Sequence, residues 1–425
     1  MAGNEKDGKG MILSYEDDPR MPCKYGPLCY QKNPTHHQKY KHPTKRKQEA
    51  EKNVNKKQKL TAKDNIAKKV PSPARKEVST TKKEPEFQTA CTDNKTTQLS
   101  IPDEDDLSAS PENVRESIKQ KFLVDMPEDF YSFWSFCESL SSNKPEEALK
   151  DAGLLLVGPF DVLSGKLKKI KHRKLSLYLI HWRYYYDPPE FQTIIKGDNS
   201  KQYHMGYFRD DPQELPCFVA CNMAAVDCTI KPLAENIFGA VNAYLEEMKE
   251  KIDPFRKMKV AKIQTSLQTW AKEKNFTLDR TTPEMKTRDR KVVTKSFHKA
   301  GIVVPWNKKT ELGYRELLET DANLKKILAN ILDSRSEVEK NAHFGKLQPI
   351  VTGANIATDE CDFGTSLELG IDLFCFGGEV FHRTALNLLQ TGYSLLHRNE
   401  FIQIAEAHLK NRRKGAALSI VEENA

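Results

Sequence analysis

The sequence predicts an α+β fold in which a small antiparallel sheet lies between two sets of helices. Residues 170–225 hold short β-rich runs separated by turn residues, as antiparallel strands do. Helical spacing of apolar residues precedes and follows this region without alternating with it, which argues against a βαβ architecture. The chain has 425 residues and therefore room for two or three domains of about 150 residues each.

The elements before and within the sheet are expected in a fixed order. Two helices come first, beginning at Pro111 and at Pro127, and the second is rich in aromatic residues. Alternation or β-propensity then predicts strands at 175–180, 191–195, 202–208 and 217–220. Asp187-Pro-Pro-Glu190 is the expected turn between the first two of these strands.

Helices are expected to dominate the rest of the chain. Six apolar residues at helical spacing predict a helix from Phe238 to Ile252 that ends at Asp253-Pro254. Further helices are expected at 321–333 and in two stretches within 379–412. The globular region thus covers 112–413, divided into halves at 112–255 and 256–413, and 414–425 form a tail.

Positive charge is concentrated in one segment. Residues 41–90 contain 15 Lys and Arg against 6 Asp and Glu, in a chain whose net charge is +8. Because this stretch is poor in apolar residues and lacks periodicity, residues 44–111 are expected to be a disordered basic linker, and residues 1–19 to be disordered as well. Lys45–Lys47 and Lys56–Lys59 resemble a two-part nuclear localisation signal. Alternatively, the segment is a solvated tether, which can also contact nucleic acid weakly.

The nine cysteines do not suggest a disulfide framework. The chain opens without a secretory signal pattern, and no apolar run in it approaches the length of a membrane span. A reducing, intracellular compartment without membrane insertion is therefore expected.

Residues 20–43 have the ligand set of a small zinc finger. Cys23, Cys29, His36 and His42 follow the pattern Cys-x5-Cys-x6-His-x5-His, and two thiolates with two imidazoles form a closed tetrahedral zinc site. A segment this short cannot bury a core, so metal binding would supply most of its folding free energy. The spacing does not fit the finger that reads DNA.

The residues between these ligands resemble the poly(ADP-ribose)-binding zinc finger. The resemblance rests on the pairs Tyr25-Gly26, Cys29-Tyr30 and His42-Pro43, together with Arg20 and Asn33. It implies that the finger binds the polymer through Arg20, Tyr25 and Tyr30, since tyrosines stack on adenine and cations neutralise phosphate. Gln31, where the family carries Arg, and Thr44-Lys45, where Gly-Asp is common, depart from the pattern and imply a reduced affinity. The alternative is a structural zinc clip with incidental tyrosines.

The globular region lacks the motifs of a free-standing enzyme. It has no phosphate-binding or dinucleotide-binding glycine loop and no nucleophile elbow or kinase signature. Its most unusual stretch crowds the carboxylates of Asp359, Glu360 and Asp362 into four residues of a loop expected between Gly353 and Gly364. A carboxylate in such a loop can accept a proton. The alternative is a solvated acidic loop.

From residue 112 to 413 the chain resembles the histone PARylation factor 1 family. Four stretches carry the resemblance in order along the chain: Tyr314-Arg315, Asp359–Gly364, Leu367–Cys375 and Leu395–Asn399. The resemblance implies a protein that binds DNA-damage-activated poly(ADP-ribose) polymerases in the nucleus and completes their active site. The modified proteins would be histones and others that present a serine.

The same resemblance assigns roles to single residues. Glu360 matches the general base that takes the proton of the acceptor serine, and Asp359 matches a carboxylate that contacts the polymerase. Tyr314 and Arg315 match residues that dock the partner and hold the glutamate. The polymerase would hold NAD+, while the cofactor of this chain would be one structural zinc ion in the finger.

Two further functions stay open from the sequence. The first is a non-catalytic DNA-repair scaffold that only binds poly(ADP-ribose). The second is a repair nuclease in which Asp359, Glu360 and Asp362 hold Mg2+. The nuclease is the weaker hypothesis, because neighbouring residues on a short loop rarely all face one ion.

Overall fold

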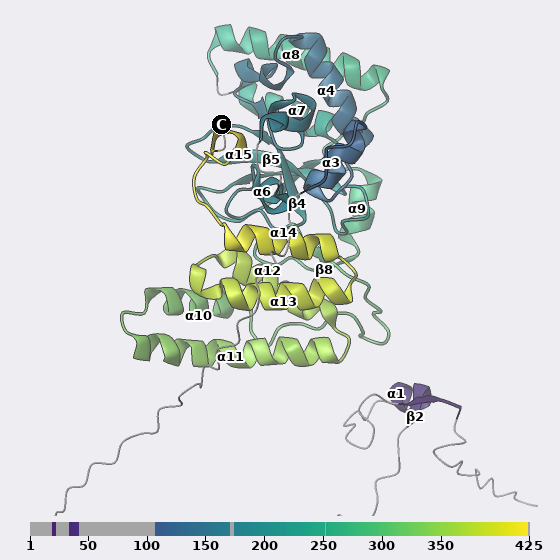
Figure 1. Ribbon diagram of the computed structural model, residues 1–425, viewed down its shortest axis with the longest axis vertical. Coiled ribbons are helices and arrows are strands. Elements are labelled where there is room, and N and C mark those ends of the chain that lie inside the picture. Colours follow the sequence, from purple (N-terminus) through teal and green to yellow (C-terminus); the bar gives the residue numbers. More distant parts are fainter. Residues whose placement is uncertain (1–18, 23–33, 42–106, 171–173, 251, 424–425) are drawn as a thin grey trace, which may run out of the picture. The chain divides into compact units, whose positions relative to one another are not determined.

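The computed structural model describes residues 19–22, 34–41, 107–170, 174–250 and 252–423. These residues fall into two units, a small one near the N-terminus and a large one from residue 107 onward, and each is considered by itself (Figure 1).

The small unit contains a parallel pair of short strands and one helix. Strand β1 (Met21–Pro22) pairs with β2 (Tyr40–Lys41), so that Met21 lies opposite Tyr40. Helix α1 (Pro34–Lys39) leads directly into β2 and carries His36, whose ring lies 5.0 Å from that of Tyr40. The small unit thus draws together the two ends of the segment in which the finger is expected.

The large unit is built from one sheet, a two-stranded ribbon and many helices. Its strands are β3 (Leu155–Leu156), β4 (Phe191–Lys196), β5 (Tyr203–Phe208), β6 (Phe218–Met223), β7 (Lys231–Ala234), β8 (Val292–Thr294) and β9 (Ile302–Val303). Its helices are α3 (Val114–Phe122), α4 (Glu128–Leu140), α5 (Phe160–Leu163), α6 (Leu175–Ile180), α7 (Ile237–Lys249), α8 (Pro254–Glu273), α9 (Pro283–Asp289), α10 (Asp321–Asp333), α11 (Glu337–Asp359), α12 (Phe363–Phe376), α13 (His382–Leu395), α14 (Asn399–Lys410) and α15 (Ile420–Glu423), with short 3-10 turns at Pro145–Glu147, Lys150–Ala152, Lys166–Lys169 and Glu379–Phe381.

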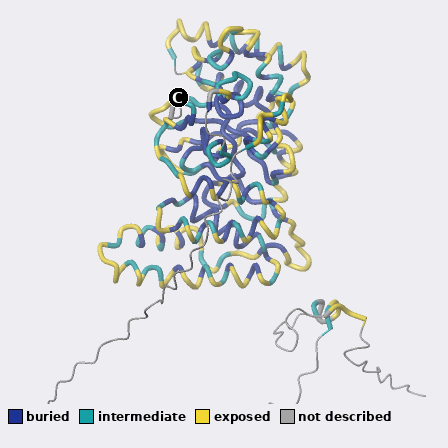
Figure 2. Tube along the Cα trace, viewed as in Figure 1, coloured by how far each residue is buried: buried dark blue, intermediate teal, exposed yellow. Residues whose placement is uncertain are grey.

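The predicted α+β class and antiparallel sheet are confirmed. Five strands are ordered β3-β4-β5-β6-β7, and every neighbouring pair is antiparallel. The strands expected at 191–195, 202–208 and 217–220 are present as β4, β5 and β6. Buried residues fill the sheet region and the inner faces of the helices around it (Figure 2).

The strand predicted at 175–180 is wrong, because these residues form helix α6. The alternation of Leu175, Leu177 and Leu179 suggested a strand with one apolar face. In the structure Tyr178, Leu179 and Ile180 are all buried, since α6 packs between α3 and α14. The place beside β4 is taken instead by β3.

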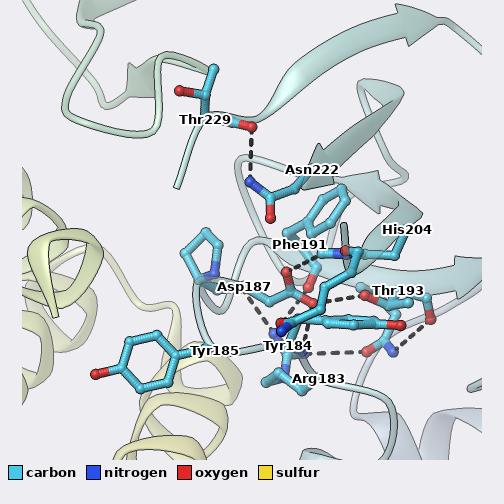
Figure 3. A network of polar contacts seen from close by, with 12 residues as sticks. Arg183, Tyr184, Tyr185, Asp187, Phe191, Thr193, His204, Asn222 and Thr229 are labelled. Atoms are coloured by element: carbon cyan, nitrogen blue, oxygen red, sulfur yellow. Dashed lines mark hydrogen bonds and ion pairs between the residues drawn. The ribbon is translucent and has the colours of Figure 1, made fainter. Parts of the chain in front are cut away.

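The expected turn at Asp187–Glu190 is buried and organised by one carboxylate (Figure 3). Asp187 accepts hydrogen bonds from the Thr193 hydroxyl at 2.7 Å and the Tyr184 amide at 3.0 Å, and lies 2.7 Å from Nε2 of His204. The Tyr184 ring stacks on the His204 ring at 3.8 Å. A buried polar group is costly unless it is hydrogen-bonded, and both carboxylate oxygens of Asp187 have partners in this network.

The helix end predicted at Asp253-Pro254 is wrong as well. Helix α7 ends at Lys249, and Asp253 is the N-cap of α8, where its side chain accepts the Arg256 amide at 3.0 Å. Aspartate followed by proline is a helix-start signal as well as a stop signal. The division expected between residues 255 and 256 falls in the first turn of α8, which packs on α7.

The C-terminal part is a stack of helices, as expected. Helix α10 has the predicted bounds, and α13 and α14 are the two helices expected within 379–412. Helix α14 contacts both α6 and α13 and so joins the sheet region to the other helices (Figure 1). The expected acidic loop is much shorter than predicted, because Gly353 lies inside α11 and only residues 360–362 separate α11 from α12.

Both ends of the globular region contact its core. Residues 107–111, expected to belong to the linker, lie near α3, where Gln120 and Lys121 bond Ser108 and Ser110. In the expected tail, Leu418 and Ile420 are buried, and the Ile420 amide donates to Nδ1 of His181 at 3.2 Å. Within the described part of the chain, no helix combines the length and apolarity that a membrane span requires.

A buried histidine should make stability depend on pH. His298 is fully buried, and burial, with smaller effects from Arg288 and Lys299, lowers its pKa from 6.5 to about 3. Since the unfolded chain binds the proton more readily, the contribution of neutral His298 is complete above the unfolded pKa and is lost as the pH falls toward the folded pKa. We expect the stability difference between wild type and His298→Gln to shrink by about 1–2 kcal/mol between about pH 7 and pH 5 in urea unfolding. An unchanged difference would show that His298 does not titrate with unfolding.

Candidate docking and catalytic site

One face of helix α12 carries four polar residues that together hold the segment in front of it. Asp362 at its N-cap, followed by Thr365, Glu368 and Asp372, are spaced by three, three and four residues and therefore lie on one side of the helix. Each of the four is at least nine-tenths buried. Together they accept hydrogen bonds from residues between 294 and 315, and we call them the α12 polar stripe.

Asp362 makes the contacts at the start of the stripe. Its Oδ1 accepts the Gly313 amide at 3.0 Å, and its Oδ2 accepts Nε and Nη2 of Arg315 at 2.9 and 2.7 Å. Thr365 adds two bonds to the Arg315 backbone, accepting from its amide at 3.1 Å and donating to its carbonyl at 2.7 Å. Both the backbone and the guanidinium of Arg315 are thereby fixed.

Gly313 permits this close approach. Its φ is +112°, and an added Cβ would lie 2.0 Å from the Pro305 carbonyl oxygen. Its own carbonyl accepts the Gly364 amide at 2.9 Å. A side chain at position 313 would therefore collide with the backbone at Pro305 and displace the segment that carries Arg315.

Glu360 lies at the rim of this arrangement. It is the C-cap residue of α11, and its Oε2 accepts Nη2 of Arg315 at 2.5 Å. The guanidinium thus bridges two carboxylates, and the bond to Glu360 is the largest cause that raises the pKa of Arg315. The Glu360 side chain is 34% exposed, whereas that of Asp362 is 6% exposed. Glu360 is held and still reaches solvent.

The three carboxylates predicted as one acidic cluster have different surroundings. Asp359, the last residue of α11, is exposed, whereas Asp362 is buried against Arg315. The positive φ of Cys361, +73°, turns the chain between them. In the part of the chain that the structure describes, the carboxylates close enough to share a metal ion are a different set, Asp321, Glu368 and Asp372. The grouping on which the nuclease reading depends is therefore not formed.

Tyr314 is directed inward, away from solvent. Its residue is 9% exposed, its hydroxyl donates to Oε2 of Glu368 at 3.1 Å, and its ring meets that of Trp306 edge-on at 6.2 Å. Burial first, and the charge of Glu368 second, raise the pKa of the Tyr314 phenol. The side chain that the sequence resemblance led us to expect in docking thus lies inside the protein, next to the residue whose guanidinium Asp362 holds.

The finger residues are only partly described. Arg20 is exposed just before β1, and His36 lies on α1. The other sequence-predicted residues of the finger, Cys23, Tyr25, Cys29, Tyr30 and His42, lie outside the described residues. Two thiolates and two imidazoles remain the donor set that suits tetrahedral zinc.

Comparison with known proteins assigns both units to families. A family model described as Histone PARylation factor 1 matches residues 113–412. The chain belongs to the Histone PARylation factor 1 family. It is 48% identical over 305 residues to Histone PARylation factor 1 of Bos taurus, with 71% of this chain and 88% of the bovine protein covered. The corresponding protein of Mus musculus is 46% identical over 303 residues, covering 71% of this chain and 87% of its own length. That of Danio rerio is 45% identical over 310 residues, covering 72% and 88%.

A second model, described as the PBZ domain and of the CCHH zinc-finger type, matches residues 20–45. The two families predicted from the sequence motifs, Histone PARylation factor 1 and the poly(ADP-ribose)-binding zinc finger (PBZ), are thus confirmed. The PBZ match implies that the small unit binds structural zinc.

Sequence reasoning missed the α12 polar stripe. It singled out Asp362 as one of three neighbouring acids and did not pair it with Arg315. A signal was present, since Asp362, Thr365, Glu368 and Asp372 recur at helical spacing inside a segment that is apolar apart from them and Ser366. Polar residues at that spacing in a buried helix require partners.

Two neighbouring carboxylates should differ sharply in their effect on stability. Asp362→Asn places an amide donor against the donors of Arg315 and Gly313, so the free energy of unfolding should fall by about 1–3 kcal/mol. Asp359→Asn is the matched control and should change it by less than about 0.5 kcal/mol, because Asp359 is exposed. Urea unfolding measures both variants, and equal effects would contradict the structural role of Asp362.

Proposed function

We propose that this protein is a cofactor of DNA-damage-activated poly(ADP-ribose) polymerases and supplies Glu360 as the general base for ADP-ribosylation of serine on histones and other proteins. Membership of the Histone PARylation factor 1 family supports the cofactor role. The observation that carries the assignment of Glu360 is its position, with one carboxylate oxygen held by Arg315 and the side chain still reaching solvent.

The proposed chemistry divides between the two proteins. The polymerase holds NAD+, and the serine oxygen bonds to the ribose carbon that carries nicotinamide while the bond to nicotinamide breaks. Glu360 accepts the serine proton, which matters because a serine hydroxyl is a weak nucleophile without a base. Arg315 positions the glutamate, as a planar guanidinium with several donors is suited to do.

Docking would use the surface around the same residues. Asp359 is exposed at the end of α11, and the Arg315 side chain is 46% exposed. Both can therefore contact a polymerase while Asp362 holds Arg315 from inside. Tyr314 would contribute by fixing the chain that carries Arg315, as well as through its ring.

The small unit would read the product of the same reaction. In this proposal Cys23, Cys29, His36 and His42 hold one structural zinc ion, and Arg20, Tyr25 and Tyr30 contact poly(ADP-ribose). Support comes from the PBZ match and from the exposure of Arg20. Zinc would fix the fold of the segment without taking part in the transfer reaction.

The basic segment would direct the protein to the nucleus. Lys45–Lys47 and Lys56–Lys59 supply two clusters of positive charge, and the location of the proposed partners at damaged DNA supports the assignment. The same segment can add weak, salt-dependent contacts with nucleic acid.

Glu360→Gln tests the catalytic role. The amide keeps the size of the side chain but cannot accept a proton, so serine modification should fall about 10²- to 10⁴-fold while binding to the polymerase remains. The measurement combines a pull-down with serine ADP-ribosylation of a histone peptide in the presence of polymerase and NAD+. Glu337→Gln, at the exposed opposite end of α11, is the matched control and should change neither. A near wild-type rate for Glu360→Gln would favour the non-catalytic scaffold.

Tyr25→Ala tests the reader role. Removing one stacking ring should leave zinc content unchanged and weaken polymer binding by about tenfold or more. Native mass spectrometry measures zinc, and fluorescence anisotropy with labelled poly(ADP-ribose) measures affinity. Cys29→Ala should lose both properties, and Tyr15→Ala, outside the finger, should lose neither. If Tyr25→Ala binds the polymer normally, the finger is a structural clip.

A further inference from the structure

Glu368 lies behind the candidate site and touches it through a single residue. It is 4% exposed, and its two oxygens accept different hydroxyl groups. Oε2 accepts the Tyr314 hydroxyl at 3.1 Å, and Oε1 accepts the Thr294 hydroxyl at 2.6 Å. Glu368 is a residue of α12, and Thr294, which holds its carboxylate, is a residue of β8.

The supports of Glu368 and those of Glu360 are separate. Arg315 is fixed to Asp362 and Thr365 through its guanidinium and its backbone, and Arg315 in turn holds Glu360. Glu368 has no bond to Arg315 or Glu360 among the described contacts and reaches the docking segment through the Tyr314 hydroxyl. A change at Glu368 should therefore act first on Tyr314, while Asp362 and Thr365 still hold Arg315 and, through it, Glu360.

The surroundings of Glu368 keep its carboxyl group fixed. Asp372 lies one turn further along α12, where it accepts the Ser296 hydroxyl at 2.6 Å and the Phe297 amide at 2.8 Å. Burial raises the pKa of Glu368, while Thr294 and Tyr314 oppose that shift and the nearby acids Asp321 and Glu316 add to it. Only neutral hydroxyls donate to Glu368 among the described contacts, so its orientation depends on these two bonds.

We propose that Glu368 is a positioning residue that fixes Tyr314 beneath the polymerase-docking surface and thereby sets the affinity for the polymerase rather than the rate of serine modification. This inference rests on the proposed function, in which Tyr314 and Arg315 take part in docking. The geometry separates the two roles, because the α12 polar stripe holds Tyr314 through Glu368 and Arg315 through Asp362 and Thr365.

The first test needs no polymerase. Replacing the carboxylate that accepts the Tyr314 hydroxyl should change the chemical shift of the Tyr314 Cζ at neutral pH. The measurement is an NMR spectrum of 13C-labelled tyrosine, in which Tyr314→Phe identifies the Tyr314 signal. Glu368→Gln should move this signal and leave the other tyrosine signals in place. An unmoved Tyr314 signal would show that the hydrogen bond does not form in solution and would overturn the inference.

The second test is a double-mutant cycle on affinity for the polymerase. Tyr314→Phe and Glu368→Gln should each weaken binding about three- to tenfold, and the double variant should bind no more weakly than Tyr314→Phe alone. Serine modification at saturating cofactor should stay near wild type in all three. Additive losses would overturn the inference, because Glu368 would then act without Tyr314. A loss in the saturated rate instead of the affinity would do the same.

The matched control is Asp372→Asn, on the same face of α12 but without contact to Tyr314. It should change thermal stability and leave the Kd for the polymerase unchanged, whereas Glu368→Gln should change the Kd. If Glu368→Gln does not fold, Thr294→Val replaces it in the cycle, since that change removes the other anchor of the carboxylate. A Tyr314→Phe variant with wild-type affinity would refute this inference, while the proposed function would still stand or fall on Glu360→Gln.

Discussion

The contact between Asp362 and Arg315 is the interaction on which the candidate site depends. Asp362 is 4% exposed and stands between α11 and α12, where one carboxylate accepts the Gly313 amide and two guanidinium nitrogens. Partial burial of an ion pair contributes little net stability, since desolvation offsets much of the attraction. It does select one arrangement, because any other rotamer of Arg315 would leave a buried carboxylate without a cation. The positions of the other residues in the site follow from this single rotamer of Arg315.

The α12 polar stripe extends the same constraint along the helix. Residues between β9 and α10 have little regular secondary structure, so their backbone groups need partners other than a ladder of strands or helical turns. The side chains of Asp362 and Thr365 accept hydrogen bonds from the backbone amides of Gly313 and Arg315. Those of Glu368 and Asp372 accept hydrogen bonds from hydroxyl groups nearer to β8. A mostly apolar, buried helix thus specifies the path of an irregular segment, because each polar group of the stripe would be costly to bury alone.

Local patterns predicted much of the fold, and their failures share one cause. Helix α10 has the bounds that its spacing indicated, and three strands lie where alternation placed them. The errors at 175–180 and at Asp253-Pro254 arose where the local signal fits two structures and distant packing decides, as α14 does for α6. The family motifs identified Arg315 and Glu360, but no rule of sequence adjacency pairs Arg315 with Asp362, 47 residues away. The two residues meet only because α12 packs against the segment that carries Arg315.

The exposure of the three neighbouring carboxylates supports a separate role for each. A proton acceptor must be fixed in position and must also meet its substrate, and these requirements conflict for a single side chain. In the proposed function these requirements are divided between residues at the junction of α11 and α12. Buried Asp362 fixes Arg315, Arg315 fixes half-buried Glu360, and Asp359 is exposed and takes no part in these contacts. A turn of three residues, with Cys361 at positive φ, is what allows adjacent acids to occupy such different environments. The run of acids is therefore better understood as a helix junction than as a charged loop.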